Sequence, residues 1–237
     1  MRIALIAPLP PEQNGIADYA FSLQQALSQE SLQLIAPFKN QRLADRPSGI
    51  ARQMQSIDWQ KFDLVHAELG GGRSGEFMAL EWLSEHYPSL PLSATVHDPE
   101  RLIWRPAGWP LLLNRLLPRW VYQLLILLCD PFTLARERRL AAKLRVLITL
   151  TAMGGRCLTE RMRLPDGKVR KIAHGNQIIA AQPLPALPPS GLLQILYFGF
   201  IYRGKGIEDL IDALALLKIQ RPYVAVSLTL AGGLHRK

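Results

Sequence analysis

Residues 197–217, YFGFIYRGKGIEDLIDALALL, decide the fold of this chain. A nearly continuous apolar run, residues 192–198, leads into the first glycine, as is typical of a parallel strand covered on both faces. Beyond a loop with three glycines, apolar residues recur at helical spacing, so one helix face can pack on the sheet. Arg203 and Lys205 precede that helix. Cations beside the free N–H groups of a helix N-terminus favour anion binding.

The same stretch resembles the start of the second half of a GT-B glycosyltransferase of glycosyltransferase family 4. In that family, a strand ending in Gly is followed by a loop ending in Lys-Gly and by a helix of the type Ile-x-x-Leu-Ile-x-Ala. The resemblance implies that Arg203, Lys205 and Gly206 hold the diphosphate of a nucleotide-sugar donor. Many members carry the arginine directly after the glycine, where this chain has Phe200. The alternative is an ordinary basic turn. The matching residues are Gly199, Lys205, Gly206, Ile207, Leu210, Ile211 and Ala213.

Composition indicates a globular protein of a reducing compartment. The chain has 237 residues, of which 49% are hydrophobic, enough for a sizeable core. Its two cysteines, Cys129 and Cys157, provide no disulfide framework, which predicts a cytoplasmic location. The N-terminus, MRIALIAPLPP, reads as a first strand rather than as a signal peptide.

The excess positive charge is concentrated in residues 101–171. This region has 15 lysines and arginines against four acids, a local charge of +11 within a net charge of +9. Such a region can meet nucleic acid, anionic lipid or a phosphorylated substrate, or it can be a solvated face. We expect no nucleic-acid partner, because the charge lies in a Leu- and Trp-rich segment without a recognised nucleic-acid motif.

The first turn of the chain, residues 8–15, is predicted to bind ligand. It follows a short apolar strand and leads into a helix, and such turns lie beyond the carboxyl ends of the strands, where α/β proteins bind ligands. The sequence Pro-Pro-x-x-x-Gly-Ile-Ala-Asp-Tyr resembles the first loop of family 4. The resemblance implies that the backbone of Gly15 borders donor phosphate and acceptor, with Asn14, Ile16 and Asp18 beside it. The alternative is a plain turn in which Asp18 only favours the helix dipole.

A second predicted turn follows the strand at residues 62–69, FDLVHAEL, which ends in three glycines. Glycines directly after a strand indicate close approach of the backbone to a ligand, so Gly70 is a candidate for the acceptor cleft. His66 and Glu68 alternate along the strand and point to one face, and Glu68 is a second cleft candidate. The ordinary alternative is a hydrogen-bonded core histidine.

A third predicted turn, His97-Asp98-Pro99, follows the strand at residues 92–96. In family 4, a histidine in this position faces the cleft near donor sugar and acceptor. The resemblance therefore implies that His97 is the catalytic candidate and that Asp98 borders the acceptor. The alternative is a histidine that only caps the strand. Whether His97 moves a proton or donates a hydrogen bond is open at this point.

Residues 102–145 form a basic, Leu- and Trp-rich segment that we expect to be helical. Its apolar run, residues 120–129, is too short to span a bilayer. Aromatic rings among arginines suit a membrane interface, so we hypothesise peripheral attachment to the anionic inner face of the membrane. The alternative is a buried helical hairpin with a basic outer face.

These observations predict an α/β fold of the GT-B type. Residues 1–185 form a complete Rossmann-like, acceptor-side domain, and residues 186–237 begin a nucleotide-sugar-binding domain. The proline-rich residues 182–190 suit a linker. His174-Gly175 resembles the Pro-His-Gly segment between the GT-B halves, with Ala173 in place of proline. The second half has only a strand, a helix and a strand, and the family's Glu-x7-Glu pair has no counterpart here. We therefore expect this chain to be inactive or nearly so. The resemblance to the GT-B fold also implies that the two halves face each other.

The implied function is a retaining glycosyltransferase that moves a sugar from a nucleotide-sugar donor to a polysaccharide- or lipid-linked acceptor. No metal site or cofactor is expected, because the sequence has no Asp-x-Asp and no convincing His/Cys cluster. The alternative is a catalytically silent fragment that binds the acceptor or the membrane. The absence of Gly-x-Gly-x-x-Gly gives no support for a classical NAD site.

Overall fold

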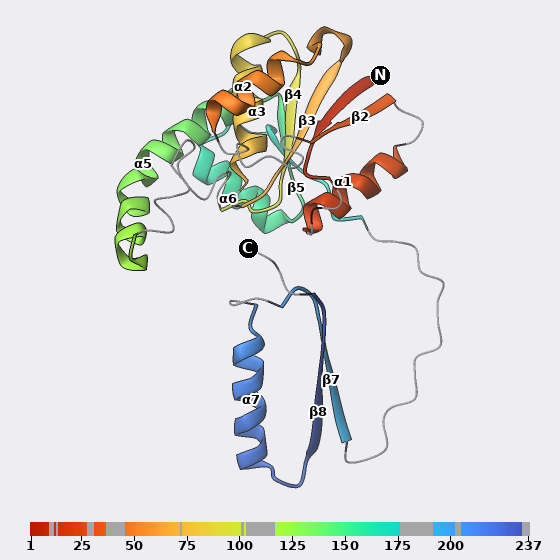
Figure 1. Ribbon diagram of the computed structural model, residues 1–237, viewed down its shortest axis with the longest axis vertical. Coiled ribbons are helices and arrows are strands. Elements are labelled where there is room, and N and C mark those ends of the chain that lie inside the picture. Colours follow the sequence, from red (N-terminus) through yellow and green to blue (C-terminus); the bar gives the residue numbers. More distant parts are fainter. Residues whose placement is uncertain are drawn as a thin grey trace. The chain divides into compact units, whose positions relative to one another are not determined.

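The computed structural model describes residues 1–9, 12, 14–27, 31–36, 46–71, 73–100, 102, 117–175, 192–201 and 205–233. It divides into two compact units, Met1–Asn176 and Gln177–Lys237 (Figure 1). The domain boundary expected near residue 185, and the proline-rich segment around it, lie outside the described residues.

The first unit is a six-stranded, entirely parallel sheet with helices on both faces, in the strand order β2-β1-β3-β4-β5-β6. This architecture confirms the expected α/β, Rossmann-like class. Its strands are β1 (Arg2–Ile6), β2 (Ser31–Ile35), β3 (Leu64–Leu69), β4 (Leu92–Val96), β5 (Val146–Thr149) and β6 (Val169–Lys171). Its helices are α1 (Gly15–Ala26), α2 (Pro47–Gln55), the short 3-10 helix η1 (Trp59–Lys61), α3 (Ser74–His86), α5 (Arg119–Lys143) and α6 (Ala152–Met162).

The two faces of the sheet are covered by different helices. Ala4 and Ile6 of β1 belong to the large core that includes α2, α3, α5 and α6. Leu5, which points the other way, packs with Ala20 of α1. Helix α1 follows β1 on one face of the sheet, and α3 follows β3 on the other. The direction in which successive strands are added to the sheet therefore reverses between β1 and β3. The carboxyl ends of these two strands therefore border the crevice in which α/β proteins bind ligands.

Helix α5 differs between its two ends. It spans 25 residues with Pro131 inside it. Its second half is held on the first unit by the buried Glu137, Leu140 and Ala141. None of the described helices combines the length and the apolar content that a membrane-spanning segment needs. Residues 103–116, which the alternative of a buried helical hairpin would include, lie outside the described residues.

The second unit consists of β7 (Leu192–Phe198), α7 (Ile207–Gln220) and β8 (Ala225–Ala231) within the described residues. The two strands pair in parallel along their whole length. The expected strand and helix are therefore present, and residues 202–204 of the loop between them lie outside the described residues. Gly206 caps α7 with φ 75°, a left-handed conformation that favours glycine. Ile207 is the buried residue of α7, and most of β7 and β8 is exposed.

Candidate functional site

Three turns of the first unit meet at the carboxyl edge of its sheet: those after β1, β3 and β4. A side chain on Gly70 would collide with Ile16, because an added Cβ would lie 2.2 Å from the Ile16 Cδ1 atom. The Asp98 carboxylate accepts a hydrogen bond from the Gly71 N–H. We call this edge, comprising Gly15, Ile16, Gly70, His97 and Asp98, the mouth of the first unit. The turns predicted separately thus lie together.

His97 is held at the mouth by a buried carboxylate. Its Nε2–H donates to Glu68 Oε2 over 2.8 Å, and its backbone N–H donates to Leu69 O over 2.8 Å. The Glu68 side chain has no exposed surface, whereas the His97 side chain is 12% exposed. Glu68 was expected to face the cleft; the structure instead places it beneath His97, so it positions the ring. In the neutral ring, donation from Nε2 leaves Nδ1 able to accept a proton.

A second histidine lies on the other side of Glu68. His66 Nε2 is 3.4 Å from Glu68 Oε1, and the His66 ring nitrogens lie 2.8 and 2.9 Å from the hydroxyls of Ser93 and Thr95. These contacts follow from register, because His66 pairs with Ser93 and Glu68 with Thr95 on adjacent strands. The result is a His66–Glu68–His97 chain of polar side chains. His66 has the hydrogen-bonded core environment of the ordinary alternative.

The charge of Glu68 is stabilised by its neighbours. Burial raises the pKa of its carboxyl, but the contacts with His66 and His97 outweigh burial and hold that pKa below its ordinary value. Glu68 is therefore ionised at neutral pH. An ionised carboxylate orients a histidine and stabilises its protonated form, which are requirements of a general acid or base.

Tyr19 closes the site from α1. Its ring lies edge-on to His97 at 5.1 Å between centroids, and edge-on to His174 at 5.2 Å. Burial, and then the negative charge of Glu68, raise the pKa of the Tyr19 hydroxyl. His174, after β6, thus joins residues that follow β1 and β4. No role was predicted for Tyr19 from the sequence, although it ends the motif Gly-Ile-Ala-Asp-Tyr.

The remaining predicted residues of the first turn have simpler environments. The Asn14 side chain caps α1, because its Oδ1 accepts from the Ala17 N–H over 2.8 Å. Asp18 is exposed in the first turn of α1, as the plain-turn alternative expects. Gly15 is exposed, and an added Cβ would have nothing within 4 Å. Gly15 is therefore distinguished by the open space around it and not by a strained backbone.

Arg73, which precedes α3, is engaged by two carboxylates. Its guanidinium bonds to Glu12 and lies 2.7 Å from Glu76 Oε1. Burial raises the pKa of Glu76 more than the charge of Arg73 lowers it. The contact between Arg73 and Glu12 holds the turns after β1 and β3 together. Because two carboxylates neutralise Arg73, it offers little positive charge to an anionic ligand.

The predicted phosphate-binding residues lie in the second unit and are described by themselves. Lys205 is exposed and directly precedes Gly206, the cap of α7. Glu208 and Asp209 occupy the first turn of that helix. Their charges stabilise the helix N-terminus and weaken its attraction for a further anion. Arg203 lies outside the described residues.

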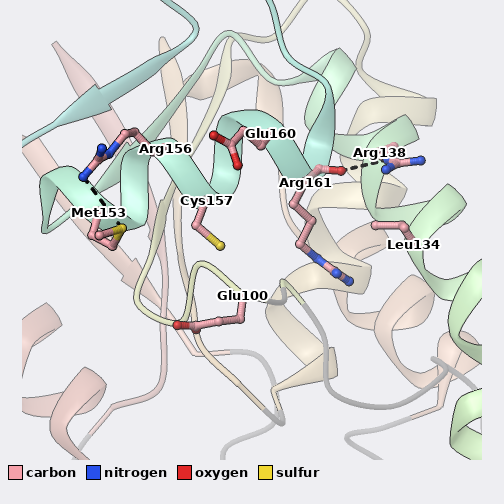
Figure 2. Close-up of a pocket in the computed structure, with 8 residues that line it drawn as sticks. All are labelled: Glu100, Leu134, Arg138, Met153, Arg156, Cys157, Glu160 and Arg161. Carbon is pink, nitrogen blue, oxygen red and sulfur yellow. Dashed lines mark hydrogen bonds between the residues drawn. The ribbon is translucent and has the colours of Figure 1, made fainter.

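A cavity of about 660 Å³ opens elsewhere in the first unit, between α5, α6 and Glu100. Three arginines line it: Arg138, Arg156 and Arg161. Figure 2 shows the heads of Arg138 and Arg156 directed away from each other. The Nε of Arg138 donates to the backbone oxygen of Arg161, and Arg161 pairs with the buried Glu137. These arginines do not converge, so the cavity does not form an anion site.

Within the described ranges, no group of three or more His, Cys, Asp or Glu side chains could hold a metal ion. The site that the geometry supports is therefore the mouth with the His66–Glu68–His97 chain and Tyr19.

No protein-family model matches the chain, and no curated protein matches it. Among solved structures, it is similar to UDP-N-acetylglucosamine 2-epimerase from Rickettsia bellii, with 11% sequence identity and a TM-score of 0.47. The match covers 97% of this chain and 62% of that chain, so the chain spans less than two thirds of this neighbour's length.

Proposed function

We propose that the chain carries the acceptor-side half of a retaining glycosyltransferase that moves a sugar from a nucleotide-sugar donor to a polysaccharide- or lipid-linked acceptor. The observation that carries the proposal is the position of His97 at the mouth, where its Nε2 is hydrogen-bonded to the buried Glu68 and its Nδ1 is the nitrogen that can accept a proton. The resemblance of the turns after β1 and β7 to those of glycosyltransferase family 4 gives the reaction class.

In the proposed reaction, His97 contacts the acceptor hydroxyl or the donor sugar, and Glu68 and His66 position its ring. Gly15 provides an open backbone edge, while Asn14, Ile16, Gly70 and Asp98 shape the turns around it. A neutral histidine whose other nitrogen donates to a carboxylate is suited to accept the hydroxyl proton as the bond to the sugar forms. Asp18, which is exposed in the first turn of α1, is left at the periphery of this site.

The donor side is assigned to the second unit. Negative charge grows on the leaving diphosphate as the sugar bond breaks, and fixed cations and backbone N–H groups stabilise that charge. We assign this role to Lys205, Gly206 and Arg203. Arg73 is engaged by Glu12 and Glu76, which makes the mouth of the first unit better suited to a neutral sugar hydroxyl than to phosphate. The proposal requires neither metal nor cofactor.

The second candidate is a silent fragment that binds acceptor or membrane. It is favoured by the exposed strands and helix of the second unit, which offer few buried residues to hold a donor. We propose a peripheral location on the cytoplasmic face of a membrane in both cases.

The test is release of nucleoside diphosphate from UDP-, GDP- and ADP-linked hexoses. It compares this chain with the same residues joined to a complete second nucleotide-fold half. We expect turnover in the joined protein and little or none in this chain. His97→Ala should lower turnover about 100-fold or more, the range of general acid–base catalysis. His86→Ala is the matched control, because the exposed His86 stacks on Trp82 away from the mouth. Absence of turnover in both proteins would contradict the enzyme, and equal turnover would contradict the need for the added half.

A further inference from the structure

The first half of α5 presents large apolar side chains to solvent. Trp120, Leu127 and Phe132 are 69%, 69% and 78% exposed, and Leu124 and Leu128 are 49% and 61% exposed. Figure 1 shows this light-green half of α5 extending away from the sheet of its unit. We call these five residues the apolar strip. Large exposed apolar patches mark interaction sites.

The strip occupies one side of the helix. Leu124, Leu128 and Phe132 follow Trp120 at intervals of four residues, and Leu127 lies seven residues beyond Trp120. Between Trp120 and Phe132, Asp130 is the single charged residue. At 1.5 Å per residue this half is about 20 Å long, shorter than the hydrocarbon core of about 30 Å. The geometry therefore fits a helix lying at an interface, not one that crosses it.

Positive charge accompanies the strip. Arg139 is exposed and lies seven residues beyond Phe132, on the same side of the helix. In the sequence from residue 101 to residue 129 there are four arginines and no acid. Basic residues beside inserted apolar groups are attracted by the negative surface of an anionic leaflet. Two copies of the strip packed against each other would instead bring like charges together.

We infer that the apolar strip of α5 docks on an anionic lipid bilayer, with its Trp, Leu and Phe side chains among the acyl chains and Arg139 at the headgroups. Docking through this strip gives the face from which a lipid-linked acceptor would be reached, a role that rests on the proposed function. Docking itself involves no sugar chemistry, so its test stands apart from the turnover assay.

The experiment is flotation of the full chain with vesicles of phosphatidylcholine alone and of phosphatidylcholine mixed with phosphatidylglycerol. We expect binding to the mixed vesicles that weakens between about 0.1 M and about 1 M salt, as the Debye length falls from about 10 Å to about 3 Å. Leu127→Gln/Leu128→Gln should weaken binding about tenfold or more, since two apolar side chains lose their burial. Leu216→Gln/Ile219→Gln is the matched control, because these α7 residues are 57% and 77% exposed.

The charge is tested by Arg139→Gln, which should weaken binding about fivefold. Its control is Arg52→Gln, an exposed arginine of α2. If the leucine variant does not fold, brominated phosphatidylcholine should quench the wild-type protein more than Trp120→Phe. Equal quenching, equal binding to both vesicle types or no binding would overturn the inference. A concentration-dependent dimer that the leucine variant dissociates, without vesicle binding, would assign the strip to a second copy instead. Failure of docking with sugar turnover intact would leave the proposed function standing.

Discussion

Nε2 of His97 lies 2.8 Å from Oε2 of Glu68, a carboxylate with no exposed surface at the carboxyl edge of a parallel sheet. Glu68 lies in β3 and His97 directly follows the adjacent strand β4, and Glu68 has His66 on its other side. A buried charge requires such partners, because an isolated carboxylate would lose its hydration without compensation. The pair therefore links the stability of the first unit to the orientation of its candidate catalytic ring.

Glu68→Gln should lower the free energy of unfolding by about 1–2 kcal/mol, because an ionic hydrogen bond is replaced by a neutral one. Urea denaturation measures the change. Glu85→Gln, at an exposed position of α3, is the control and should stay within about 0.5 kcal/mol of the wild type. Equal effects of the two substitutions would show that the Glu68–His97 contact contributes nothing.

The contribution of Glu68 should depend on pH with a defined sign. The pKa of its carboxyl is lower in the folded chain than the ordinary value of 4.5, so its stabilisation is present above pH 4.5 and is lost as pH falls through the folded pKa. The difference in unfolding free energy between the wild type and Glu68→Gln should shrink across that range. Glu76, whose pKa is raised, acts in the opposite direction but is common to both proteins. A difference that stays constant with pH would refute the shift.

The Tyr19 hydroxyl should ionise later than an ordinary phenol. Burial and the charge of Glu68 raise its pKa above 10.0, so the stability that depends on neutral Tyr19 is fully present below pH 10.0 and is lost as pH rises from there through the higher folded pKa. The difference in ultraviolet absorbance between the wild type and Tyr19→Phe isolates this titration. Its midpoint should lie above 10.0, and a midpoint at or below 10.0 would contradict the closed position of the ring.

Gly70→Ala should destabilise the first unit by about 0.5–1.5 kcal/mol, because the new Cβ meets the Cδ1 end of the half-buried Ile16 side chain, which must turn aside. Ile16→Val removes that atom, so the double variant should recover part of the loss, and the two effects should not add. Gly15→Ala is the comparison: nothing lies within 4 Å of its added Cβ, so thermal unfolding should change little. A larger loss from Gly15→Ala than from Gly70→Ala would mean that the turns are packed differently.

The second unit shows what local sequence can predict. The apolar run, the glycines and the helical spacing of residues 192–217 predict β7, the loop and α7 without knowledge of any distant contact. Positions of the turns after β1, β3 and β4 were predictable for the same reason. In a parallel sheet those turns share one edge, so their meeting at the mouth follows from the strand pattern.

The contacts of the site were not predictable in this way. Alternation along β3 places His66 and Glu68 on one face, but which strand lies beside them, and in which register, depends on the assembled sheet. That register decides that Glu68 lies under His97 and not in the open cleft. Tyr19 and His174 meet because α1 and the segment after β6 pack together, although 155 positions separate them. By contrast, the Arg73–Glu76 pair has the i,i+3 spacing of helical ion pairs and could have been found from sequence.

An amide chemical-shift map of the chain during titration with UDP, GDP and ADP tests whether the turn before α7 binds a nucleotide. The proposal predicts that at least one nucleotide shifts the amides of Lys205, Gly206 and Ile207. It also predicts that Lys205→Gln weakens that binding about fivefold or more, as expected for the loss of a charge-assisted contact to phosphate. Lys218→Gln, in the last turn of α7, should leave it unchanged. Absence of shifts at the start of α7, or equal weakening by both substitutions, would show that this turn does not hold a donor diphosphate.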